Sequence, residues 1–107
     1  MTQTAYRQLR DTWERAVEEI LFRQVVVRFR KGVETTRLRE VVVEDGDYAL
    51  IHQGMTKCSN YSHDKAPMAG VAVPDPEELL DDINKLDEWR KAIEERSQEV
   101  AKNRKAV

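Results

Sequence analysis

The most specific local signal in this chain is a helix start in its C-terminal third. Asp75 can accept a backbone N–H bond as an N-cap, and Pro76 occupies the first helical position, where its missing N–H costs nothing. Glu78 completes a capping-box pattern with Asp75. Apolar residues then recur at heptad-like intervals, at Leu79, Ile83, Leu86, Trp89, Ile93 and Val100. The sequence therefore predicts a long last helix that begins at Asp75 or Pro76.

A second long helix is predicted near the N-terminus, where apolar residues recur every three or four positions. They are Tyr6, Leu9, Trp13, Ala16, Val17, Ile20 and Leu21. This spacing places them on one helix face, and the opposite face carries charge pairs of the kind found on solvated helices. We expect Trp13 and Trp89 to share one core, with the first and last helices antiparallel.

The segment Asp45–Asp64 is predicted to contain a shorter middle helix, on which the two long helices close, and to end in a polar run. Asp45 is the expected N-cap, and Asp47 is favourable near the positive end of the helix. Four apolar residues are spaced three, four and three apart and define the expected buried stripe. They are Tyr48, Ile51, Met55 and Cys58.

Residues 24–43 are compatible with two structures. The β-branched runs Val25–Val27 and Val41–Val43 could pair across a turn at Lys31 and Gly32 as a β-hairpin. An isolated hairpin is marginally stable, so we favour a first helix extended to about Arg30, a break near Gly32 and a short helix at 36–41. The predicted fold is an all-α bundle of four to five helices with long first and last helices. The alternative is an α+β fold with a short hairpin at 25–43.

Length and composition are those of one small globular domain. The 107 residues predict a single helical domain, 1–107, with frayed ends at about 1–4 and 101–107. A single cysteine, Cys58, excludes an internal disulfide and a multi-thiolate zinc site and favours a reducing compartment. No apolar run is long enough to cross a bilayer, so we expect a cytoplasmic protein without membrane contact.

Charge is distributed unevenly along the chain. Residues 1–40 carry nine Lys or Arg and six Asp or Glu, whereas residues 41–107 carry nine and fourteen. The candidate partner-binding residues, called here the basic tract, are Arg28, Arg30, Lys31, Arg37 and Arg39. They could be a plain solvated face, contact an acidic protein surface, or bind nucleic acid weakly. An acidic tract is their complement, so a homodimer is plausible. It comprises Asp75, Glu77, Glu78, Asp81, Asp82, Asp87 and Glu88.

No set of residues has the spacing of a catalytic or metal site. His63 and Asp64 follow the middle helix and His52 precedes them, but no H-x-x-x-H or H-E-x-x-H spacing is present. Cys58 falls on the apolar stripe. We expect His63 and Asp64 to form a loop motif that ends the middle helix, with no further role assigned. The sequence predicts no enzyme, no metal and no cofactor.

Several blocks in one order carry a resemblance to a known family. The blocks are 9–21, 27–30, 33–35, 55–59, 63–64 and 74–78. Together they resemble the C-terminal segment of large bacterial coiled-coil P-loop ATPases, the SMC- or RecF-like proteins that include the anticodon-nuclease-like PrrC group. The chain has no G-x-x-x-x-G-K-[ST] loop, so the ATP chemistry of that family is not carried over. Ser62 precedes His63 where the family pattern has glycine.

The resemblance implies a non-catalytic protein-interaction or regulatory module. Such a module would dock on a larger ATPase, nuclease or phage-defence complex. One alternative is a small inhibitor, encoded by a phage or mobile element, that binds a host defence complex. The other is a weak nucleic-acid-binding regulator that uses the basic tract.

Overall fold

The computed structural model describes residues 2–62 and 74–104, and every regular element within them is a helix. The elements are α1 (Thr2–Ala16), the π-helix η1 (Val17–Leu21), the 3-10 helix η2 (Thr35–Glu40), α2 (Asp45–Ser62) and α3 (Pro76–Asn103). The predicted small all-α bundle is confirmed. Residues 25–43 lie entirely within the described part and contain no strand, so the hairpin alternative is wrong.

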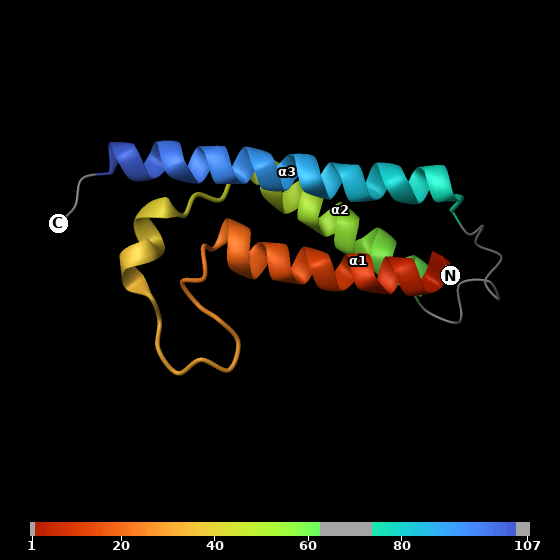
Figure 1. Ribbon diagram of the computed structural model, residues 1–107, viewed down its shortest axis with the longest axis horizontal. Coiled ribbons are helices and arrows are strands. Elements are labelled where there is room, and N and C mark those ends of the chain that lie inside the picture. The colour runs from red at the N-terminus through yellow and green to blue at the C-terminus, as the bar shows by residue number, and fades with distance from the viewer. Residues whose placement is uncertain (1, 63–73, 105–107) are drawn as a thin grey trace.

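The three α-helices form an elongated, flat molecule with extents of 55 × 29 × 20 Å. α1 and α3 run in the same direction, and α2 runs diagonally between them in the opposite direction (Figure 1). Tyr6 contacts Asp82 and Trp13 contacts Trp89, which is the register of a parallel pair. The expected antiparallel arrangement of first and last helices is wrong, because a chain that reverses direction twice returns to its first direction.

The core is centred on Trp13 and Trp89, the two tryptophans that the sequence predicts to share one core. The Trp13 and Trp89 rings lie 5.4 Å apart at 43°, and both side chains are buried. The other buried apolar residues are Tyr6, Leu9, Ala16, Leu21, Val25, Cys58, Leu86 and Ile93. Gly54 of α2 lies directly against Trp13, because a Cβ at this position would stand 2.7 Å from Cε2 of the indole. The missing side chain therefore allows α2 to approach α1 closely.

The buried stripe of α2 differs from the predicted one at its first position. Cys58 is buried, and Ile51 and Met55 are half-buried as expected, but Tyr48 is 69% exposed. Asp47 occupies the buried position instead and is 2% exposed. Side-chain hydrophobicity alone predicts Tyr48 at the first buried position of α2. The fold supplies hydrogen-bond partners that make the Asp47 carboxylate acceptable in the core instead.

The helix starts follow their capping residues. Asp75 Oδ1 accepts from the Glu78 N–H at 2.8 Å, as predicted for α3. The Glu78 side chain does not close the box but binds Lys57 Nζ at 2.9 Å. At the start of α2, Asp47 Oδ2 accepts from the N–H of Glu44 at 2.8 Å, so the cap is formed by this pair and not by Asp45.

The first helix ends earlier than predicted. The helix continues through η1 only to Leu21, because Arg23 and Gln24 adopt positive φ angles of 52° and 59°. Left-handed backbone at two successive non-glycine residues breaks a right-handed helix. The predicted extension to Arg30 is therefore wrong. The short helix expected at 36–41 is present as η2.

A polar cluster joins all three α-helices near the start of α3. Asp82 of α3 accepts from the Tyr6 hydroxyl at 2.6 Å and lies 2.9 Å from Lys57 Nζ. Burial lowers the pKa of Lys57, but bonds to Glu78 and Asp82 outweigh it and the pKa is raised. Burial and the hydrogen bond to Asp82 both raise the pKa of Tyr6. The cluster therefore fixes the register of α1 and α3.

None of the helices within 2–62 and 74–104 is long and apolar enough to cross a membrane.

Candidate functional site

The segment that departs most from the bundle is residues 22–44, called here the projecting loop. It leaves the end of η1, extends away from the three α-helices and returns through η2 to α2 (Figure 1). Of the basic tract, Arg28, Arg30 and Lys31 precede η2 and Arg37 and Arg39 lie within it, and all five are exposed. The loop carries six basic and three acidic residues.

The loop begins with a tightly hydrogen-bonded helix end. The N–H of Phe22 bonds Val17 O at 3.0 Å, and the N–H of Gln24 bonds Glu18 O at 3.0 Å. The first bond is the i→i−5 bond of the π-helix and the second reaches the Glu18 carbonyl beyond it, so both satisfy carbonyls that the helix end leaves free. The direction in which the loop departs is therefore set by backbone hydrogen bonds.

Arg30 holds the two sides of the loop together. Its NH2 donates to Gln24 O at 2.7 Å and to Val25 O at 3.0 Å, and its Nε donates to Gly32 O at 3.3 Å. The N–H of Glu34 also bonds Val25 O, at 2.7 Å. A guanidinium can make several such bonds because its donors are fixed in one plane. Arg30 is thus a structural residue of the loop.

Two further residues of the basic tract also bind within the chain. Arg28 lies 3.2 Å from Glu18 and 3.5 Å from Glu14, and its backbone N–H bonds Glu18 Oε1 at 2.8 Å. That backbone bond lowers the pKa of Glu18. Arg37 donates to the Gln24 side chain at 2.9 Å. The predicted tract is therefore not one uniform binding face, although Lys31 and Arg39 present exposed charges.

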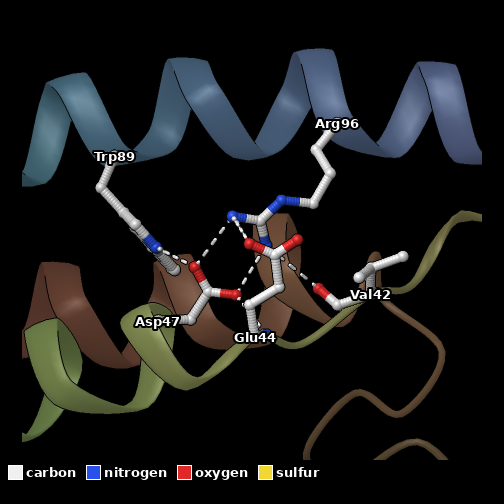
Figure 2. Close-up of polar contacts among 5 residues, drawn as sticks. All are labelled: Val42, Glu44, Asp47, Trp89 and Arg96. Carbon is white, nitrogen blue, oxygen red and sulfur yellow. Dashed lines mark hydrogen bonds and ion pairs between the residues drawn. The ribbon is translucent and has the colours of Figure 1, made fainter.

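The return of the loop is fixed to α3 by two arginines. Arg104 donates to Leu38 O at 3.0 Å and to Val41 O at 2.9 Å. Arg96 donates to Val42 O at 3.4 Å (Figure 2). The side chains of Arg23 and Glu40 also pair, at 3.2 Å. The loop is therefore connected to the bundle at both ends.

Arg96 belongs to a buried network around Asp47. Figure 2 shows Trp89 and Arg96 of α3 pointing at the Asp47 carboxylate at the start of α2. Trp89 Nε1 donates to Oδ1 at 3.0 Å, and Arg96 donates to Oδ2 at 2.6 Å and to Oδ1 at 3.2 Å. Glu44 adds an ion pair to Arg96 at 3.2 Å. Burial raises the pKa of Asp47, but these bonds outweigh it and the pKa lies below its usual value.

Large apolar side chains are exposed on the projecting loop and the adjoining start of α2. This apolar patch comprises Phe22, Val26, Phe29, Val33, Leu38, Val43 and Tyr48. Phe29 is fully exposed and has a φ of 69°, a left-handed conformation that is unusual for an aromatic residue. The contacts of Arg30 hold this residue at the outer surface of the loop.

An apolar groove continues the patch between η1 and α2. It consists of two overlapping hollows of about 350 and 330 Å³, which share Val17, Phe22, Ile51 and Met55. Val26 borders one hollow, and Val43 and Tyr48 border the other. Four members of the patch, Phe22, Val26, Val43 and Tyr48, therefore line the groove.

A second cleft, of about 260 Å³, lies between the helices and is lined by polar and apolar groups. Lys57 and Asp82 border it but bind each other, and Cys58 is buried beneath it. Burial and the nearby Asp82 carboxylate raise the pKa of Cys58 to about 11, so its thiol is not activated as a nucleophile.

The two histidines differ in what the structure says of them. His63 and Asp64 lie outside the described residues. His52 is exposed on α2 and stacks on Tyr48 with ring centroids 5.8 Å apart. Within 2–62 and 74–104, no three His, Cys, Asp or Glu side chains gather as a metal ion would require.

Comparison with known proteins adds no family. No protein-family model matches the chain, and no curated protein or solved structure matches it. The resemblance to the C-terminal segment of coiled-coil ATPases therefore stays a prediction.

Sequence reasoning missed the apolar patch and the role of Asp47. The sequence indicates the basic residues of segment 24–43 as the site, whereas the structure also exposes the apolar side chains between them. One signal is present in the sequence: the apolar residues Phe29, Val33 and Leu38 lie among charged residues, and no second amphipathic segment is predicted to cover them. The sequence predicts only a favourable position for Asp47 near the helix end, because its partners in α3 lie more than 40 residues away.

Proposed function

We propose that this chain is a non-catalytic protein-interaction module and that the projecting loop with its apolar groove is the contact surface. The proposal is carried by the apolar patch, which leaves seven large apolar side chains in water on one end of a small domain. Exposed apolar area costs roughly 25 cal/mol per Å², and contiguous apolar surface on a monomer commonly marks an interaction site.

The construction of the loop supports this proposal. Arg30, Arg96 and Arg104 hold loop carbonyls by hydrogen bonds, so the surface exists before a partner arrives. A preformed loop loses less conformational entropy on binding than a flexible one. Phe29, at the outer surface, has the character of an aromatic anchor that fills a partner pocket.

The charges around Phe29 define the chemistry of the partner. Lys31 and Arg39 are exposed beside the apolar patch, and the loop as a whole is positively charged. The best complement is an acidic protein surface that contains an apolar pocket. By the resemblance, a larger ATPase, nuclease or phage-defence complex is the first partner to test. An inhibitor encoded by a mobile element would use the same surface on a host complex.

Nucleic acid fits the loop less well. Arg28, Arg30 and Arg37 already bind groups within the chain, so few charges are left for phosphates. Phosphate contacts supply most non-specific affinity, and each lost contact weakens it. Unpaired bases stack on aromatic rings such as Phe29, but the aliphatic members of the patch, Val26, Val33, Leu38 and Val43, offer them no such contact.

Affinity capture from cell extract tests the proposal. The loop variant replaces Phe29 with Asn and Lys31 with Glu, and it avoids Arg30 and Arg37 because both donate hydrogen bonds within the loop. The control is Glu95→Lys, which changes the charge by the same amount at an exposed position of α3. We expect a protein captured by wild type and control, retained after nuclease treatment and lost with the loop variant. Capture that nuclease abolishes, or that the loop variant preserves, would contradict the proposal.

A further inference from the structure

An acidic surface with exposed apolar residues is present on the chain itself, at the start of α3. Residues 75–84 contain five acidic residues and no Lys or Arg. Lys57 pairs with Glu78 and Asp82, and Glu77 and Asp81 are exposed. Leu80 and Ile83 are 56% and 43% exposed among them. This α3 surface has the chemistry that the projecting loop requires of a partner.

We propose that the projecting loop of one copy docks on the α3 surface of a second copy. The inference rests on the proposed function, because it assigns a partner to the same loop. Phe29 of one copy would cover Leu80 and Ile83 of the next. Lys31 and Arg39 would face Glu77 and Asp81. Apolar contact at the centre with opposite charges at the rim is the usual composition of a protein interface.

The position of the two surfaces shows that the contact forms between copies. The projecting loop extends from one end of the molecule on the side of α1, and α3 begins at the other end (Figure 1). The molecule is 55 Å long, so a copy cannot bring its own loop onto its own α3 surface. Each copy therefore offers one loop and one α3 surface to other copies. Two antiparallel copies can make this contact twice and close as a two-fold dimer, whereas copies joined in one direction form a head-to-tail chain; the same loop–α3 contact builds both.

Sedimentation velocity of purified protein tests this assembly. The loop variant is Phe29→Asn with Lys31→Glu, and the α3 variant is Leu80→Gln with Asp81→Lys; all four side chains are exposed. Glu95→Lys is the charge control at the far end of α3. Samples cover about 10 μM to 1 mM, a range that detects weak contacts. Urea unfolding of each variant verifies that it is folded.

We expect wild type and control to form larger species as concentration rises, and added salt to reverse this. Each variant alone should be monomeric, with association weakened at least tenfold. An equal mixture should give a one-to-one dimer and nothing larger, because the loop variant retains its α3 surface and the α3 variant retains its loop.

Three results would overturn the loop–α3 contact. They are a wild type that is monomeric throughout, a folded variant that associates like wild type, and a variant mixture that stays monomeric. A monomeric wild type would leave the proposed function standing if the capture experiment finds another protein. If the capture experiment finds no other protein but the wild type still associates with itself, only the claim of a different partner is contradicted.

Discussion

At the scale of single residues, Asp47 shows how a charge becomes part of a core. Its carboxylate is 2% exposed, yet it accepts bonds from Trp89, Arg96 and the N–H of Glu44. The network joins the start of α2 to the middle of α3. Since Arg96 also holds the loop carbonyl of Val42, the same residue couples the core to the projecting loop.

Removing this carboxylate should destabilise the fold strongly. Asp47→Ala leaves Trp89 Nε1 and the Arg96 guanidinium without their acceptor, and breaking such a buried pair costs on the order of 3 kcal/mol. Asp47→Asn keeps one acceptor oxygen for Trp89 and should lose less. Urea unfolding of the three proteins measures this order. Equal stability of wild type and Asp47→Ala would show that the network does not form.

The pH dependence of stability follows from the same residue. The pKa of Asp47 is lower in the folded chain than the usual 3.8. Its contribution is therefore complete above the unfolded pKa and is lost as the pH falls through the folded value. We expect unfolding free energy to decline below about pH 4 in wild type and to decline less steeply in Asp47→Asn. Parallel curves for the two proteins would assign the acid sensitivity to other carboxylates.

At the scale of elements, the contact of α1 with α2 depends on a glycine. A Cβ at Gly54 would stand 2.7 Å from Trp13, whereas one at Gly46 of the same helix would meet nothing within 4 Å. Gly54→Ala should therefore cost about 1–3 kcal/mol through overpacking. Gly46→Ala, the matched control, should be neutral or stabilising because alanine favours helix. Thermal unfolding that ranks the two variants the other way would contradict the close approach.

The projecting loop is an element whose order depends on Arg30. Lysine keeps the charge of this residue but cannot reproduce the planar set of bonds to Gln24 O, Val25 O and Gly32 O. In Arg30→Lys we expect faster exchange of the Glu34 amide, which bonds Val25 O, with little change in core amides. Hydrogen exchange read by NMR measures both. Unchanged exchange at Glu34 would mean that the backbone orders the loop without Arg30.

At the scale of the whole molecule, the sequence predicts the helices better than their arrangement. The Asp75–Pro76 start and the stripe containing Trp13 are local patterns, and both are confirmed. The parallel direction of α1 and α3 is a property of how many times the chain turns. The burial of Asp47 depends on partners in a distant helix. Neither the parallel direction of the helices nor the burial of Asp47 can be predicted from the spacing of hydrophobic residues alone.

The candidate site was predictable only in part. Its position in segment 24–43 and its positive charge are visible in the sequence. The end of the helix at Leu21 is not, because no glycine or proline marks it and the turn uses strained backbone at Arg23 and Gln24. That early end is what leaves Phe29 in water.

The most direct test of the docking surface is photo-crosslinking from position 29 in living cells. A photoreactive phenylalanine analogue replaces Phe29, and because this side chain is fully exposed the replacement leaves the fold undisturbed. In the control protein the analogue replaces Gln98, which is exposed on α3. We predict a discrete protein adduct from position 29 and none from position 98, and excess unlabelled wild type should reduce the yield. No adduct from position 29, equal adducts from both positions, or an adduct to nucleic acid would contradict it.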